Sequence, residues 1–104
     1  MTLVFRPQFW FDLEDGVAYL AEKGSPETAR RWRDEVMATV KRVQERPDLG
    51  RPRPDLHPRD IRSLVVIRYP KYLLFYHWSG DTVEVLRIKH GMMDLPALFS
   101  GTGQ

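Results

Sequence analysis

The sequence contains no cysteine, which excludes disulfide bonds, thiolate nucleophiles and cysteine-ligated metals, and is typical of a reducing compartment. It also lacks a long apolar run. The first residues, MTLVFR, place no apolar stretch behind a basic start, so neither a signal peptide nor a membrane span is predicted. We therefore expect a cytoplasmic protein with no membrane attachment.

The sequence also has almost no excess of charge of one sign. Its 104 residues include 16 Lys or Arg and 14 Asp or Glu, which gives a net charge of only +2. With 42% hydrophobic and 29% charged residues, the composition is that of one globular domain spanning residues 1–104. The charge is unevenly distributed: residues 46–71 hold seven Lys or Arg against three Asp, which gives 7 − 3 = +4. This segment is either a phosphate-facing patch or a solvated loop.

The hydrophobic pattern predicts one strand, two helices and then three strands. We expect a strand in residues 1–7, a helical hairpin in 8–46, an irregular loop in 47–60, strands in 61–90 and a tail in 91–104 that begins with a short helical turn. This order predicts an α+β fold. Its sheet would be four-stranded and mostly antiparallel, with a three-stranded meander and both helices on one face.

The two helices are predicted from apolar stripes at helical spacing. In the first, Trp10, Leu13, Val17 and Leu20 form the stripe, while acids including Asp12 occupy other faces. The second begins at Ser25-Pro26-Glu27, which combines a capping hydroxyl, a proline at the first helical position and an acid near the positive helix end. Its stripe comprises Ala29, Trp32, Val36, Val40 and Val43.

The central hairpin is predicted from two apolar runs, residues 72–78 and 82–90, joined by the turn Ser79-Gly80-Asp81. Both runs carry apolar side chains on both faces. A strand with this pattern usually has something packed on each side, so the hairpin should form the centre of the sheet.

Several short motifs then stand in a specific order. They are Pro47-x-x-Gly50-x-Pro-x-x-Asp55-Leu56, Arg62 at a strand start, Tyr72-Leu-Leu-Phe-Tyr76, Val85-Leu-Arg87-Ile and His90-Gly91-x-x-Asp94-Leu95. Together with the helical hairpin, this arrangement resembles the RelE/ParE superfamily of type II toxin-antitoxin toxins, from about residue 2 to residue 99. The tail, HGMMDLP, is more similar to the ParE branch than to the RelE branch.

The resemblance implies a small bacterial toxin that a cognate antitoxin protein wraps and neutralises, with no cofactor and no metal. Three functions remain open. A ParE-like toxin would inhibit DNA gyrase and arrest growth without being an enzyme. A RelE-like toxin would be a metal-free endoribonuclease that cuts mRNA on the ribosome. A degenerate member would only bind its antitoxin.

A metal-free ribonuclease needs a base, an acid and fixed cations around the scissile phosphate. The candidates for proton transfer are His57, His77 and His90, and those for charge are Arg62, Arg68, Lys71, Arg87 and Lys89. The best available catalytic set is His90, Arg62 and Arg87, although strand alternation separates His90 from Arg87 and Lys89.

Each candidate also has a structural interpretation. Arg62 could pair with a carboxylate or a helix end, and it is predicted to share a strand face with Arg68. Arg87, in an apolar strand, needs an acidic partner such as Asp94 or a groove, because an unpaired buried charge is costly. Tyr72 and Tyr76 fit core aromatics with hydroxyl groups at the edge.

The residues predicted to contact the target or the antitoxin are Arg62, Arg68, Tyr72, Tyr76, Arg87, His90, Met92 and Met93. Met92 and Met93 would form an adaptable apolar edge suited to gripping a protein. The antitoxin is expected in an apolar groove between the helical hairpin and the sheet, and along an exposed sheet edge. Trp10 and Trp32 could line that groove or pack between the helices.

Overall fold

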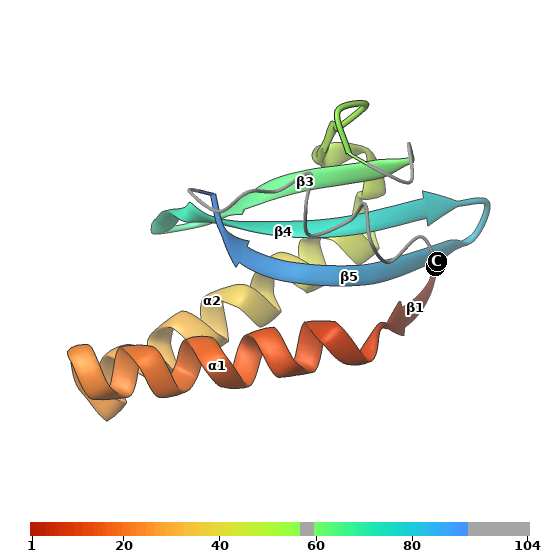
Figure 1. The fold of residues 1–104 in the computed structure, drawn as a ribbon. Coiled ribbons are helices and arrows are strands. Elements are labelled where there is room, and N and C mark those ends of the chain that lie inside the picture. The colour runs from red at the N-terminus through yellow and green to blue at the C-terminus, as the bar shows by residue number, and fades with distance from the viewer. Residues whose placement is uncertain (57–59, 92–104) are drawn as a thin grey trace.

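A computed structural model describes residues 1–56 and 60–91. Strand β1 (Thr2–Phe5) leads into helices α1 (Pro7–Lys23) and α2 (Pro26–Glu45). A short 3-10 helix, η1 (Pro47–Leu49), and a short strand, β2 (Arg51–Pro52), follow. The chain continues with β3 (Ile61–Val66), β4 (Tyr69–Ser79) and β5 (Thr82–His90). The predicted α+β order is therefore confirmed (Figure 1).

The sheet has five strands in the order β1-β5-β4-β3-β2. Strand β1 is parallel to β5, and every other pair is antiparallel. The central position predicted for the β4–β5 hairpin is confirmed for β4 and for the first half of β5, which β1 flanks as far as Val85. The predicted strand count of four was too low, because Arg51 and Pro52, within the loop expected to be irregular, pair with Ser63 and Arg62.

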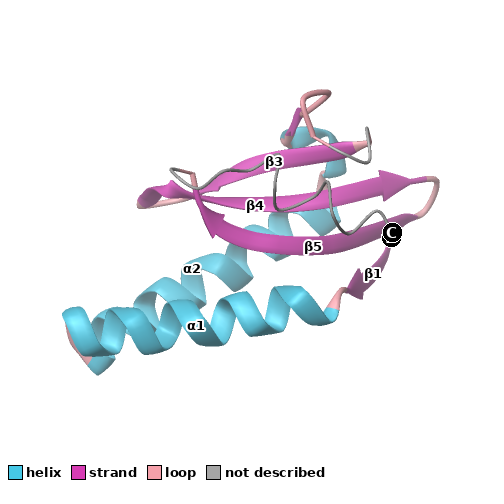
Figure 2. Cartoon of the chain, in the orientation of Figure 1, coloured by secondary structure: helices cyan, strands magenta, loops and turns pink. Residues whose placement is uncertain are grey.

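The main core lies between the sheet and the helical hairpin, which covers one face of the sheet (Figure 2). The predicted stripe of α2 is confirmed, since Ala29, Trp32, Val36, Val40 and Val43 are all buried. A smaller buried cluster on the opposite sheet face comprises Leu56, Ile61, Phe75 and Leu86. No helix in the described residues has the length and apolar character needed to cross a membrane.

Helix α2 begins where its capping signal predicts. The side chain of Ser25 accepts a hydrogen bond from the backbone N–H of Thr28 at 3.1 Å, and Pro26 occupies the first helical position. Gly24 ends α1, and its N–H donates to the carbonyl of Leu20 at 2.8 Å. These local bonds explain why the helical hairpin could be delimited from the sequence.

The buried face of α1 is rotated from the predicted one. Phe9 is fully buried, whereas Trp10, placed on the apolar stripe by its spacing, remains 40% exposed. Asp12, expected on a solvent face, is only 6% exposed. The spacing pattern was ambiguous because three aromatic residues, Phe9 to Phe11, follow one another, and only the position of the sheet selects among them.

Gly16 of α1 lies against the indole ring of Trp32, and a Cβ atom at position 16 would overlap that ring. We expect Gly16→Ala to lower the melting temperature by several degrees. The overlap with an immobile core side chain costs about 1–3 kcal/mol, which outweighs the gain of about 1 kcal/mol in helix propensity. Thermal unfolding followed by circular dichroism tests this.

The control is the same substitution in a Trp32→Phe background, where the smaller ring relieves the overlap. There Gly16→Ala should be neutral or stabilising. A higher melting temperature for Gly16→Ala alone would contradict the packing argument.

Candidate functional site

Two cationic residues of β5, Arg87 and Lys89, converge on one buried carboxylate. Arg87 donates through Nε to Oδ2 of Asp12 at 2.7 Å and through Nη2 to Oδ1 at 2.9 Å. Lys89 Nζ lies 3.0 Å from Asp12 Oδ1. The bond to Asp12 is also the main reason that the pKa of Arg87 is raised. Two cations therefore share one acid, and this cluster carries a net positive charge.

The position of Asp12 follows from where β1 ends. The pairing of β1 with β5 stops at Phe5 and Val85, after which the Arg6 N–H donates to the Val85 carbonyl at 2.9 Å. Helix α1 then runs beside the unpaired half of β5, and Asp12 accepts a hydrogen bond from the backbone N–H of Ile88 at 3.2 Å. The carboxylate thus replaces a missing neighbouring strand.

An acidic partner for Arg87 was predicted correctly, but it is Asp12, which sequence reasoning had assigned to solvent. Asp94 lies outside the described residues. The sequence did contain a signal for the burial of Asp12. This residue lies three positions after Phe9 and one before Leu13, so it falls on the same buried face of α1 as these two residues. Two cations on an otherwise apolar strand also required an acid from another element.

His90 ends β5 on the helix-facing side of the sheet. It is paired with Tyr72 in the register, and their rings meet edge to face at 5.3 Å. Tyr72 in turn packs against Trp32 at 5.2 Å, and burial raises the pKa of Tyr72. His90 is therefore adjacent to an aromatic pair, while Arg87 and Lys89 bind Asp12.

Tyr76 anchors the loop before β2. Its hydroxyl donates to the Pro47 carbonyl at 2.6 Å and accepts from the Gly50 N–H at 2.8 Å, and the residue is fully buried. A Cβ atom on Gly50 would overlap the Tyr76 ring, so glycine allows the close approach. The predicted core role of Tyr76 is confirmed, and a direct contact with a partner is incompatible with this conformation.

Arg62 also holds this loop. Its Nη1 donates to the Gly50 carbonyl at 2.8 Å, and its guanidinium lies 5.4 Å from the ring centre of Trp78. Arg62 therefore has the predicted structural role at a helix end, because the carbonyls of Asp48 and Gly50 lie at the C-terminal end of η1. A contact with a target through its half-buried side chain stays a prediction.

Arg68 was wrongly placed on the strand beside Arg62. Strand β3 ends at Val66, and Arg68 lies in the following turn with φ +73°. Its side chain is 78% exposed, with Glu35 at 3.8 Å. Strand β3 ends early because Ile67 and Arg68 form the turn to β4. The run of apolar and β-branched residues had suggested that the strand would continue through these two positions.

Part of the basic segment is paired with its own acids within the described residues. Arg46 lies 3.1 Å from Asp48, and Arg53 lies 2.8 Å from Asp55. His77 lies 3.6 Å from the third acid, Asp60. These pairs show that the part of the segment around Arg46 and Arg53 is a self-paired loop.

The best nuclease set is not brought together. In the strand register, Arg62 stands opposite Tyr76 of β4 and His90 stands opposite Tyr72 of β4. Tyr72 and Tyr76 are about 13 Å apart along that strand, so Arg62 and His90 are separated by at least this distance along the sheet. Arg87 is bound to Asp12 at the β5 edge. His57, Met92 and Met93, together with the predicted terminal helical turn, lie outside the described residues.

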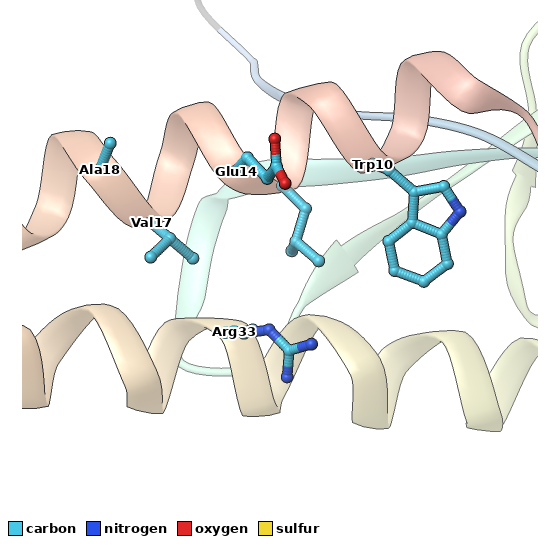
Figure 3. Close-up of a pocket in the computed structure, with 6 residues that line it drawn as sticks. Trp10, Glu14, Val17, Ala18 and Arg33 are labelled. Carbon is cyan, nitrogen blue, oxygen red and sulfur yellow. The ribbon is translucent and has the colours of Figure 1, made fainter.

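An apolar groove runs between the two helices. It has a volume of about 320 Å³ and is lined by Trp10, Leu13, Glu14, Val17, Ala18 and Arg33 (Figure 3). The groove predicted between the hairpin and the sheet was misplaced, because that space is filled by the core. Of the two tryptophans, Trp10 lines the groove and Trp32 belongs to the core.

Comparison with known families adds a decisive observation. Residues 3–95 match the family model described as the ParE toxin of the type II toxin-antitoxin system parDE. The chain belongs to the ParE toxin family. This confirms the resemblance to the RelE/ParE superfamily and its ParE branch, and it makes the chain the toxin component of a type II toxin-antitoxin system.

Solved structures show the same fold as this ParE toxin. A protein described as a chromosomal ParDE system from P. aeruginosa is 23% identical, with a TM-score of 0.74 over 86% of this chain and 95% of that one. A YoeB/ParE toxin from Agrobacterium tumefaciens is 19% identical, with a TM-score of 0.58 over 86% and 98%. Comparison with curated protein sequences gives no match.

Proposed function

We propose that this ParE toxin arrests growth by binding and inhibiting DNA gyrase in the cytoplasm, and that a cognate antitoxin neutralises it. The observation that carries the proposal is the match of residues 3–95 to the ParE toxin family. The proposed mechanism is binding and not bond cleavage.

The arrangement of the charged residues supports a binding mechanism. A ribosome-dependent mRNA endonuclease would have to place a base and at least one cation around the same phosphate. Here Arg62 bonds to a loop carbonyl, and Arg87 and Lys89 share Asp12. Moving Arg62 to a substrate would leave the Gly50 carbonyl without its side-chain donor, and moving Arg87 would remove the two hydrogen bonds that it donates to Asp12.

The test is DNA supercoiling by purified gyrase, with and without the toxin separated from its antitoxin and refolded. Circular dichroism establishes that the toxin is folded. We expect the toxin to inhibit supercoiling and added antitoxin to restore it. Relaxation of DNA by a type I topoisomerase, which is not gyrase, is the control and should be unaffected.

A folded toxin that arrests growth but leaves supercoiling intact would refute the gyrase proposal. Mapping of mRNA ends after induction would then test the ribosome as the target. A folded toxin that does not arrest growth would instead indicate a degenerate member that only binds its antitoxin.

A further inference from the structure

Strand β1 forms one edge of the sheet and leaves part of its backbone without partners (Figure 1). The N–H of Thr2 donates to the Asp81 carbonyl at 2.8 Å, and the N–H of Arg6 donates to the Val85 carbonyl at 2.9 Å. Because backbone groups alternate in direction along a strand, those of Leu3 and Phe5 point away from β5. Within residues 1–56 and 60–91, the N–H and C=O groups of these two residues form no hydrogen bond.

Both ends of this open edge are closed by the chain itself. At one end the Met1 carbonyl accepts a hydrogen bond from Nε2 of Gln44 at 3.2 Å. At the other end Pro7 has no backbone N–H to donate, and the chain enters α1 there. The open edge is therefore limited to Leu3 and Phe5. A long extended ligand would gain no further backbone bonds beyond them, so the edge fits a short strand.

A second copy of β1 has the length and the pattern that this edge requires. In an antiparallel pairing about a two-fold axis through Val4, Leu3 of each copy lies opposite Phe5 of the other. Each such pair exchanges two hydrogen bonds, so the two symmetric pairs satisfy all the open backbone groups of both copies. Met1 then falls opposite Pro7, and its carbonyl needs no donor from the second copy because Gln44 supplies one.

The side chain of Val4 suits a position on the two-fold axis. Leu3 and Phe5 pack on the helix-facing side of the sheet, so Val4 points to the opposite face, where it is 43% exposed. Two residues that lie opposite each other without exchanging hydrogen bonds have Cα atoms about 4.5 Å apart. The two Val4 side chains would therefore meet on the axis and bury each other.

The charges beside this edge are compatible with the pairing. Arg6 lies next to the strand and is held by Glu84 at 2.8 Å. In the register centred on Val4, Arg6 stands opposite Thr2 of the second copy and not opposite itself. No like charges within residues 2–6 therefore lie directly opposite each other, an arrangement that would be destabilising.

Exposed apolar side chains accompany the same edge. Four of the seven exposed large hydrophobic residues of the described chain, Met1, Val4, Trp10 and Phe11, come from its first 11 residues. Trp10 packs against Phe5, with 4.7 Å between the ring centres, so its indole lies beside β1. Exposed apolar residues gathered in this way mark interaction surfaces.

We propose that the edge of β1 pairs with the same edge of a second copy of the toxin and forms a two-fold dimer with one continuous sheet. Unpaired groups on an edge strand are a template for another strand, and the self-complementary register makes the second copy the occupant. Only a short stretch of each strand takes part, so the dimer is reversible and its fraction rises with concentration. The inference concerns assembly and does not depend on gyrase as the target.

The first experiment uses the absence of cysteine from this chain. In full-length Val4→Cys, the single thiol of each copy lies on the axis, and a Cα separation of about 4.5 Å is within the range of disulfides. Mild oxidation followed by a non-reducing gel should show a disulfide-linked dimer as the main product. Val65→Cys is the matched control, because Val65 is a 46% exposed valine on the same sheet face at the opposite side of the sheet. Since its thiols meet only by collision, it should give about tenfold less dimer.

The second experiment measures the dissociation constant of the dimer by sedimentation equilibrium. Val4→Lys and Val4→Glu each place like charges on the axis, and each should raise the constant by at least about tenfold. An equimolar mixture of the two variants should form dimers again, because opposite charges then meet on the axis. This rescue also establishes that neither variant is unfolded. Val65→Lys is the control and should leave the constant within about twofold.

Three outcomes would overturn the inference. The first is a folded toxin that stays monomeric at every concentration. The second is a dissociation constant that Val4→Lys leaves unchanged, or equal cross-linking of Val4→Cys and Val65→Cys, which would place any dimer contact elsewhere. The third is a Val4→Lys variant that self-associates as before but binds the antitoxin less tightly, which would assign the edge to the antitoxin. Inhibition of gyrase is tested separately by the supercoiling assay.

Discussion

Replacement of Asp12 by asparagine should lower the free energy of unfolding by about 3 kcal/mol, at the lower end of the range of roughly 3–5 kcal/mol for removing one partner of a buried ion pair. Asparagine keeps the acceptor for the Ile88 N–H but removes the charge that balances Arg87 and Lys89. Both cations are less than one-fifth exposed, so water compensates for the lost charge only in part.

The matched control is Asp15→Asn, which makes the same charge change three residues further along α1 at an exposed position. It should change the free energy of unfolding by less than about 0.5 kcal/mol. Both variants are compared by thermal and urea unfolding. Equal destabilisation by the two would refute a special role for the buried carboxylate.

The Asp12 cluster has a consequence for the end of the sheet. Helix α1 and the last half of β5 contact each other through this carboxylate, and His90 and Gly91 follow directly in the chain. Loss of the cluster should therefore loosen residues 86–90 before the rest of β5. Hydrogen exchange of the Ile88 amide in Asp12→Asn measures this, and unchanged protection would contradict it.

Tyr76→Phe should lower the free energy of unfolding by about 2–4 kcal/mol. It removes one hydroxyl but leaves two buried groups, the Pro47 carbonyl and the Gly50 N–H, without partners, at a cost of about 1–3 kcal/mol each. Tyr72→Phe is the control, because within the described residues no hydrogen bond to the Tyr72 hydroxyl is formed. Its cost should stay below about 1 kcal/mol, and a similar loss for both variants would contradict the argument.

The same hydroxyl should make stability fall at alkaline pH. Burial raises the pKa of Tyr76, and the hydrogen bond from Gly50 and the charge of Arg62 oppose this only in part. In the unfolded chain the tyrosine ionises near pH 10, so above about pH 10 the unfolded state binds fewer protons than the folded state. The neutral Tyr76 hydroxyl makes its full contribution to stability below pH 10. That contribution is lost as the pH rises through the pKa of Tyr76 in the folded state.

Urea unfolding between pH 8 and pH 11 tests this part of the prediction. The slope of stability against pH above pH 10 should be smaller in Tyr76→Phe than in the unchanged toxin. An identical slope would show that the alkaline loss comes from other groups, of which Tyr72 is the first to examine because its pKa is raised too.

The elements of this fold were predictable because their signals are local. The Ser25 cap, the proline at position 26 and the spacing of the α2 stripe lie within a few residues of one another, and the range 82–90 for β5 was correct. The motif around Pro47 and Gly50 was recognised only as a pattern. The structure explains this motif. The Pro47 carbonyl and the Gly50 N–H both form hydrogen bonds with the hydroxyl of Tyr76, which is 29 and 26 residues away in the chain.

The sequence by itself determined the order of the elements, the two strands at the centre of the sheet and the resemblance to the toxin superfamily, because each depends on neighbours in the chain. Tertiary structure alone decided that Asp12 is buried, that Trp10 lines a groove between the helices and that Arg62 and His90 are held apart. Each of these depends on which elements lie side by side. The bond between Asp12 and Arg87 spans 75 residues, and no local pattern specifies a partner at that separation.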